Sequence, residues 1–153
     1  MEALARGEKD EARKAFLRAC TYYRAPLFMM DPKTSAFREC VEKQQACFQA
    51  AMPLSPFPIE AIEMEYQGKK AKGYSWRGGD QGKKFPTLLI VGGMETFAED
   101  CYFITGQLAV ERGYNVIAID LPGQGMNPDQ GLFLEANMKP PVSALIDYAL
   151  SRP

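Results

Sequence analysis

Residues 87–96 read TLLIVGGMET, in which an apolar run is followed by two glycines. The run Thr87–Val91 predicts a strand of the kind that is buried on both faces of a parallel sheet. The glycines Gly92-Gly93 end that strand. Phe97–Arg112 is predicted to be a helix, and Gly113 is a natural residue to close it.

A second buried strand, Asn115–Asp120 (NVIAID), follows the predicted helix. Strand, helix and strand in this order predict one right-handed βαβ unit. The next residues, Leu121–Gly125 (LPGQG), form a tight loop, for which we favour a purely structural role, with neither Asp120 nor Gly123 acting in catalysis. A sheet ending after Asn115–Asp120 would leave an exposed apolar edge, and such an edge requires a further strand.

Two amphipathic helices are predicted upstream of this unit. Residues 2–23 carry apolar side chains at helical spacing. Asp31-Pro32 has the sequence of a helix start, with Asp at the N-cap and Pro at the first helical position. The second helix is expected to end near Ala51, and three prolines in Met52–Pro58 then indicate an extended connection.

After this connection the apolar pattern changes to a period of two. Ile59–Tyr66 and Ala71–Trp76 are predicted to form a β-hairpin around a turn at Gln67–Lys70. A polar loop is expected from Gly78 to Lys84, and a last amphipathic helix at about Val142–Leu150.

Composition excludes several classes of function. The chain has 153 residues and a formal net charge of −1, so it lacks the basic surplus that binds nucleic acid. No apolar run is long enough to cross a membrane, and the charged N-terminus does not resemble a signal peptide. The four cysteines show no C-x-x-C pairing, which favours reduced thiols and a cytoplasmic protein.

The chain contains no histidine. A Ser-His-Asp triad needs an imidazole that accepts and returns the proton of the nucleophile. The chain therefore cannot hold a complete triad by itself. Nothing in the sequence indicates a metal or an organic cofactor, and we expect none.

The strongest candidate for chemistry is the loop Gly92–Thr96. Ligands of open α/β sheets bind at the carboxyl ends of strands, and glycines there let backbone N–H groups approach a ligand closely. A tight strand–helix turn without chemistry is the equally weighted alternative.

LLIVGGMET, a helix and GYNVIAIDLPGQG together resemble strands three and four of an α/β-hydrolase. The upstream segments ARKAFLRACTYYRAP and IEMEYQGKKAKGYSW are similar, in the same order, to a subgroup of that family. The subgroup comprises 2,6-dihydropseudooxynicotine hydrolase, fermentation–respiration-switch-type esterases and fungal polyketide-shortening hydrolases. The resemblance implies an α/β fold: an incomplete α/β-hydrolase sheet, with a β-hairpin and parallel strands with crossover helices, preceded by an N-terminal helical segment. The expected division is residues 1–52 for the helical, cap-like segment and 53–153 for the first half of the hydrolase domain, truncated before the nucleophile.

The resemblance also implies roles for particular residues. Met94, after Gly92-Gly93, matches the position whose backbone N–H holds the oxyanion, and Gly93 is expected to belong to the same oxyanion hole. Glu95 matches an acidic residue that the carbon–carbon hydrolase of the subgroup places in its active site, and a structural role in capping the following helix has equal weight. From the residues themselves, Gly92 and Met126 are candidates for contact with the substrate.

The family's G-x-S-x-G nucleophile motif is absent from this chain, so its nucleophile, acid and base cannot be assigned here. The resemblance implies that the intact protein is a serine hydrolase of esters or of ketone-adjacent carbon–carbon bonds, and that this segment alone is inactive. Its expected partners are an apolar, aromatic or polyketide-like substrate and the C-terminal half of the domain, with a homodimer left open. The alternative is a non-catalytic interaction module or a complementing fragment.

Overall fold

The computed structural model describes residues 2–79 and 84–152 of the chain. The contacts between residues separate two compact units, Met1–Pro58 and Ile59–Pro153. The division into 1–52 and 53–153 as functional segments stays a prediction.

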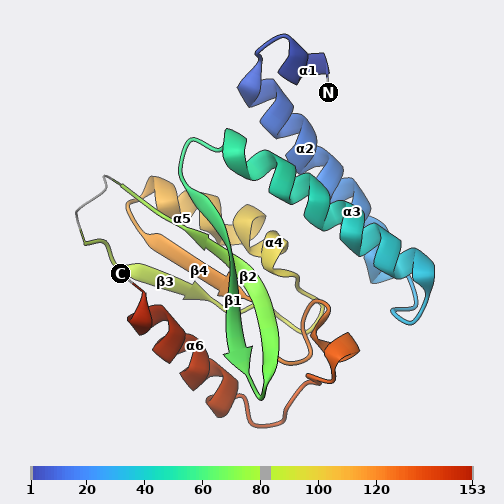
Figure 1. Cartoon of the computed structure of the whole chain (residues 1–153), viewed down its shortest axis with the longest axis vertical. Coiled ribbons are helices and arrows are strands. Elements are labelled where there is room, and N and C mark those ends of the chain that lie inside the picture. The colour runs from blue at the N-terminus through green and yellow to red at the C-terminus, as the bar shows by residue number, and fades with distance from the viewer. Residues whose placement is uncertain (1, 80–83, 153) are drawn as a thin grey trace. The chain divides into compact units, whose positions relative to one another are not determined.

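The first unit is helical. Helix α1 spans Glu2–Ala5, α2 spans Lys9–Arg24 and α3 spans Ser35–Ala51. Helices α2 and α3 pack side by side and run in opposite directions (Figure 1). Short 3₁₀ turns follow each of the two longer helices, at Ala25–Phe28 and Met52–Leu54.

Two helix starts differ from those predicted. The helix expected over residues 2–23 is interrupted because Gly7 has a φ of 77°, which is outside the helical region and favours glycine. The second helix begins at Ser35, because the Thr34 side chain accepts the N–H of Phe37 at 3.2 Å as its N-cap. Asp31, the predicted N-cap, instead accepts the N–H of Lys33 at 2.9 Å and forms a turn before the helix.

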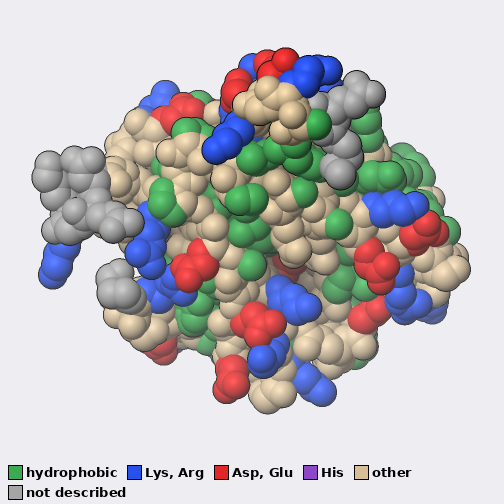
Figure 2. Space-filling view, turned by 45° about the horizontal axis from the view of Figure 1, so that its top comes forward, with side chains coloured by type: hydrophobic (Ala, Val, Ile, Leu, Met, Phe, Trp, Pro, Cys, Tyr) green, Lys and Arg blue, Asp and Glu red, His purple; other side chains and the backbone are tan. Residues whose placement is uncertain are grey.

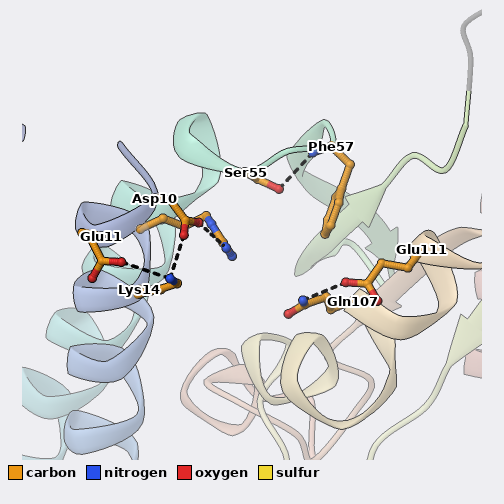
Figure 3. Close-up of polar contacts among 8 residues, drawn as sticks. Asp10, Glu11, Lys14, Ser55, Phe57, Gln107 and Glu111 are labelled. Atoms are coloured by element: carbon orange, nitrogen blue, oxygen red, sulfur yellow. Dashed lines mark hydrogen bonds and ion pairs between the residues drawn. The ribbon is translucent and has the colours of Figure 1, made fainter. Parts of the chain in front are cut away.

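Apolar side chains at helical spacing form the inner faces of these helices: Ala12, Cys20, Phe37, Val41 and Phe48 are all buried. Charged side chains occupy the outer face of α2. There Lys14 lies 2.8 Å from Asp10 and 3.0 Å from Glu11 (Figure 3). All three side chains are exposed, so these pairs contribute little to the stability of the unit.

A four-stranded mixed sheet forms the centre of the second unit. Its strands are β1 (Ile59–Tyr66), β2 (Lys69–Trp76), β3 (Thr87–Ile90) and β4 (Asn115–Ile119), in the order β1-β2-β4-β3. Strand β4 pairs antiparallel with β2 and parallel with β3. The hairpin turn is shorter than predicted: only Gln67 and Gly68 connect β1 and β2, with φ values of 50° and 70° that suit a type I′ turn.

Successive side chains of β4 point to opposite faces of the sheet. Ile117 and Ile119 belong to a buried cluster with Leu145 of α6 (Lys139–Ser151). Val116 and Ala118 are also fully buried, which shows that both faces of β4 are covered. Helix α4 (Ala98–Cys101) contacts β2 and β4, and Figure 1 shows α4 and α6 on opposite sides of the sheet.

The predicted burial of the two parallel strands needs one correction. Thr87–Val91 was expected to be buried on both faces, but β3 lies at the edge of the sheet and its residues are at most half buried, with Val91 exposed. Asn115–Asp120 was expected to form the open edge, but β4 lies between β2 and β3. The reason is that β2 occupies the side of β4 on which the next strand was expected.

The crossover helix between β3 and β4 is less regular than predicted. It consists of α4, a π-helical turn at Tyr102–Gly106, and α5 (Gln107–Glu111). Gln107 donates a hydrogen bond of 2.9 Å to Glu111 on α5 (Figure 3). The N–H of Gly113 donates to the carbonyl of Val110 at 2.9 Å and closes the helix, as predicted.

Two further predictions concern segments near these elements. Helix α6 begins at Lys139, three residues earlier than expected, because Pro140 and Pro141 fit the first helical turn, where their missing N–H groups need no partner. In the predicted polar loop from Gly78 to Lys84, residues 80–83 lie outside the described residues.

Charges and thiols complete the description of the fold. Figure 2 shows basic and acidic side chains interspersed on the face in view, in keeping with the net charge of −1. Cys20, Cys40, Cys47 and Cys101 are all free thiols. Within the described residues, no helix combines the length and the apolarity needed to cross a bilayer.

Candidate active site

Two loops leave the sheet at the same end, because parallel neighbours end on the same edge. The first follows β3 and contains Gly92–Thr96. The second follows β4 and runs from Asp120 to Gln130. Side-chain hydrogen bonds join these loops directly, as the contacts of Gln124 show.

The loop after β3 is a compact turn. The N–H of Gly93 donates to Oγ1 of Thr96 at 2.9 Å, and the N–H of Thr96 donates to the carbonyl of Gly93 at 3.0 Å. A Cβ atom on Gly92 would lie 2.5 Å from Cβ and Cγ2 of Thr96, so any side chain at position 92 would displace this turn. The glycine is therefore required by the close approach of Thr96.

Gln124 connects the two loops. Its Oε1 atom accepts the N–H of Leu121 at 2.8 Å, and its Nε2 atom donates to the carbonyl of Gly93 at 3.0 Å and to the carbonyl of Gly92. The amide oxygen therefore accepts one hydrogen bond, and the amide nitrogen donates to two carbonyls. The side chain is 4% exposed, so these bonds are shielded from competing water.

Asn127 performs a similar task within the loop after β4. Its Nδ2 atom donates to the carbonyls of Asp120 at 2.6 Å and Leu121 at 3.1 Å. Its Oδ1 atom accepts from Nε2 of Gln130 at 2.8 Å, and Gln130 also donates to the carbonyl of Lys70 at 2.9 Å. The loop after β4 is therefore fixed to itself and to β2.

The sequence-predicted site residues divide between these two loops. Gly92, Gly93, Met94 and Glu95 lie together in the loop after β3, and the Met94 and Glu95 side chains are exposed. Met126 lies in the loop after β4, two residues beyond Gln124, and is half buried. Among the described residues, the N–H of Met94 donates no hydrogen bond.

The start of α4 bears on the alternative role of Glu95. The helix has Phe97 at its N-cap, and Asp100 accepts the N–H of Phe97 at 3.0 Å. Asp100 thus supplies the carboxylate that binds this N–H. Glu95 lies two residues before the N-cap, in the turn itself.

Behind the loops lies a group of buried polar side chains. The hydroxyl of Tyr74 on β2 donates to Glu99 on α4 at 2.7 Å, and both side chains are buried. Burial raises the pKa of the Cys101 thiol to about 12, and the nearby acids Asp120, Asp100 and Glu99 add to that shift. Cys101 is therefore a protonated, unreactive thiol at neutral pH.

No group of three or more His, Cys, Asp or Glu side chains is placed to hold a metal ion within residues 2–79 and 84–152. The chemistry of the described loops is that of backbone N–H donors and amide side chains. Such groups stabilise a developing negative charge on oxygen.

Residues 1–136 match the model of a protein family described as "Esterase FrsA-like". The chain belongs to the FrsA-like esterase family. This finding confirms the resemblance stated from the sequence, and it places the chain among α/β-hydrolases.

Individual relatives are also named as hydrolases or hydrolyases. The alpha/beta hydrolase gkaG of Penicillium citrinum is 32% identical over 130 residues, which cover 82% of this chain and 30% of the relative. The hydrolyase ccsE of Aspergillus clavatus is 28% identical over 163 residues, which cover 96% of this chain and 37% of the relative. The chain thus spans about a third of the length of these curated relatives.

The fold of this FrsA-like chain is also that of a solved structure. The crystal structure of 2,6-dihydroxy-pseudo-oxynicotine hydrolase superposes with a TM-score of 0.83 at 22% identity, over 99% of this chain and 42% of that chain. The predicted fold class, an incomplete α/β-hydrolase sheet preceded by helices, is confirmed.

Sequence reasoning missed Gln124 and Asn127. The stretch LPGQG was interpreted as a structural turn because proline and glycine dominate it, and Asn127 just beyond it was not considered. The available signal was an amide residue flanked by two glycines, in a loop that follows a buried strand. An amide can bind a carbonyl and an N–H at once, which suits a residue that joins two loops.

Proposed function

We propose that the whole protein that carries this chain is a serine hydrolase, and that this chain supplies the loop that binds the oxyanion. The observation that carries the proposal is the N–H of Met94, which has no acceptor among the described residues and lies at the carboxyl end of β3. Met94 is exposed, so this donor is open to a ligand oxygen, at the edge of the sheet where ligands of open α/β sheets bind.

The proposed reaction is acyl transfer. A serine oxygen attacks the substrate carbonyl carbon, and the electron pair of the C=O bond moves to the oxygen. The N–H of Met94 and a second N–H bind that oxyanion, and each such donor lowers the barrier by about 3 kcal/mol. Collapse of the intermediate expels an alkoxide or a ketone-stabilised carbanion, which takes the proton that the base removed from serine and leaves as the alcohol or the ketone. Water then releases the acyl group by the same steps.

The nucleophile and the base lie outside this chain in this proposal, since the chain has no histidine and no G-x-S-x-G motif. The C-terminal half of the domain is the proposed source of both. The free edge of β3 supports this, because an edge strand with apolar residues is a pairing site for another strand.

Gly92 and Met126 are proposed to contact the substrate, and Glu95 to orient it or to carry a proton. The exposed Met94 side chain and the half-buried Met126 side chain suit an apolar or aromatic compound, since methionine adapts to irregular apolar surfaces. The name of the structurally similar 2,6-dihydroxy-pseudo-oxynicotine hydrolase is in keeping with such a substrate.

A non-catalytic role is the second candidate. The observation that favours it is the combination of the free β3 edge with a chain that lacks histidine. In this case the chain binds another protein through that edge.

The test uses the whole natural protein with nitrophenyl esters, a β-diketone substrate and a fluorophosphonate label for activated serines. We expect turnover of an ester or of the diketone, labelling of one serine, and a lower kcat in Glu95→Gln with unchanged unfolding. Turnover of neither substrate together with absence of labelling contradicts the hydrolase and leaves the non-catalytic role.

A further inference from the structure

Gln124 is placed to control the orientation of the loop that follows β3. It comes from the neighbouring loop, is 4% exposed, and donates from one nitrogen to the carbonyls of both Gly92 and Gly93. Its own oxygen is held by the N–H of Leu121 at 2.8 Å. The side chain is therefore fixed at both ends of its amide group.

The geometry of the peptide bond connects this contact to the proposed oxyanion site. In a trans peptide the C=O of one residue and the N–H of the next point in opposite directions. Gln124 holds the C=O of Gly93 at 3.0 Å, so the N–H of Met94 points away from Gln124 and out of the junction between the loops. Rotation of this peptide plane would break the bond to Gln124.

Two residues hold the carbonyl of Gly93. The N–H of Thr96 donates to it at 3.0 Å from within the same turn, and Nε2 of Gln124 donates to it at 3.0 Å from the neighbouring loop. Gln124 belongs to the loop after β4, which Asn127 fixes to the end of the strand. Only the bonds of Gln124 therefore connect the Gly93–Met94 peptide to a buried part of the sheet by side-chain contact among the described residues.

We propose that Gln124 is a positioning residue for the reaction: it orients the Gly93–Met94 peptide so that the N–H of Met94 faces the developing oxyanion. This inference rests on the proposed hydrolase function. It predicts that Gln124 affects the chemical step and leaves binding of the substrate unchanged, because an oxyanion donor acts on charge that forms only in the transition state.

The variant Gln124→Met removes the donor and the acceptor and keeps a similar side-chain volume. The matched control is Gln130→Met, since Gln130 also donates to a backbone carbonyl and to a neighbour, but on the side of β2. In the whole protein we expect kcat to fall about tenfold to a hundredfold in Gln124→Met, with KM within about twofold and no fall in kcat in the control. Unchanged kcat in Gln124→Met, or an equal fall in both variants, overturns the proposal.

A second variant covers the case in which Gln124→Met does not fold. Gln124→Glu keeps an oxygen for the N–H of Leu121 and loses the amide donor. A protonated carboxyl still donates one hydrogen bond, whereas a carboxylate donates none. We expect kcat of Gln124→Glu relative to that of the unsubstituted protein to rise as the pH falls. A ratio that is constant with pH contradicts the donor role.

An activity-independent measurement separates this inference from the proposed function. Amide hydrogen exchange of Gly93 and Thr96 reports whether the loop stays closed, because both N–H groups donate within it. We expect exchange at both amides to increase about tenfold or more in Gln124→Met and to stay unchanged in Gln130→Met. If the whole protein is inactive but shows this exchange pattern, the proposed hydrolase function is wrong and the role of Gln124 in holding the loop after β3 stands. Unchanged exchange in Gln124→Met would contradict that role of Gln124.

Discussion

Strands β3 and β4 are parallel neighbours with similar apolar sequences, yet their surroundings differ. Strand β4 pairs on both sides and four of its five residues are buried, while β3 pairs on one side only and none of its residues is buried. Their loops repeat the contrast. The loop after β4 holds the buried amides Gln124 and Asn127, and the loop after β3 presents the exposed Met94 and Glu95.

In the proposed oxyanion site the two loops have complementary roles. The loop after β3 carries the N–H of Met94, and the loop after β4 supplies Gln124, which binds the carbonyl of Gly93. An exposed turn can approach a substrate, but a buried network is what keeps a donor in place.

The largest expected effect compares one substitution on the two strands. In this chain, Ile117→Ala on β4 should cost about 2–5 kcal/mol of unfolding free energy, because Ile117 is buried in the cluster with Leu145. Ile90→Ala on β3 should cost about half of that or less, since Ile90 is half buried at the edge. Urea denaturation of both variants measures this. Equal costs would contradict the placement of β3 at the sheet edge.

The buried thiol behind the loops gives a pH-dependent test. The pKa of Cys101 is raised from 9.0 to about 12, mainly by burial, so the folded state keeps a proton that the unfolded state loses. The contribution of this thiol to the free energy of unfolding is fully present below pH 9. It is lost as the pH rises toward 12, by up to about 1.4 kcal/mol per pH unit. Denaturation between pH 8 and 11 should show a steeper loss than in Cys101→Ala. If the unfolding free energies of the two proteins depend on pH in the same way, folding does not raise the pKa of Cys101.

The amide network of the loop after β4 should be worth less than the strand core. Asn127→Leu leaves the carbonyls of Asp120 and Leu121 without their donor, and we expect a loss of about 1–3 kcal/mol. Gln130→Leu, at the outer end of the same network, should cost about 0.5 kcal/mol or less. If thermal unfolding is the same in both variants, the buried amide does not secure the loop.

The smallest effect is expected in the exposed turn. Thr96→Val removes the acceptor of the Gly93 N–H, with a similar side-chain shape, and should cost about 0.5–1.5 kcal/mol. Thr21→Val, on an exposed face of α2, is the control and should change stability by about 0.5 kcal/mol or less. A cost for Thr96→Val that matches that of Asn127→Leu would remove the contrast between the two loops.

The sequence was sufficient for the fold class and for most elements. Apolar period and turn residues predicted the hairpin, both parallel strands and the end of the crossover helix, because these features depend on local pattern and burial. The sequence did not predict which strand lies at the edge of the sheet. The edge position of β3 follows from the place of β2 beside β4, and no local pattern encodes that pairing.

The candidate site was predictable in part for the same reason. The position of the glycine loop after β3 follows from the order of elements, so Gly92 and Gly93 could be proposed from the sequence, whereas Met94 and Glu95 were proposed from the resemblance to the family. The bond between Gln124 and these glycines joins residues about thirty positions apart, and only the paired strands bring them together. The roles of Glu95 and Met126, and a cytoplasmic location, stay predictions.

The most direct test of the oxyanion site is a crystal structure of the whole protein inhibited with an aryl phosphonate, whose charged oxygen stands in for the oxyanion. The account predicts that this oxygen lies about 2.7–3.1 Å from the backbone nitrogen of Met94, with Gln124 still bound to the carbonyl of Gly93. A phosphonate oxygen held by other donors, with the N–H of Met94 turned away from it, would contradict the account.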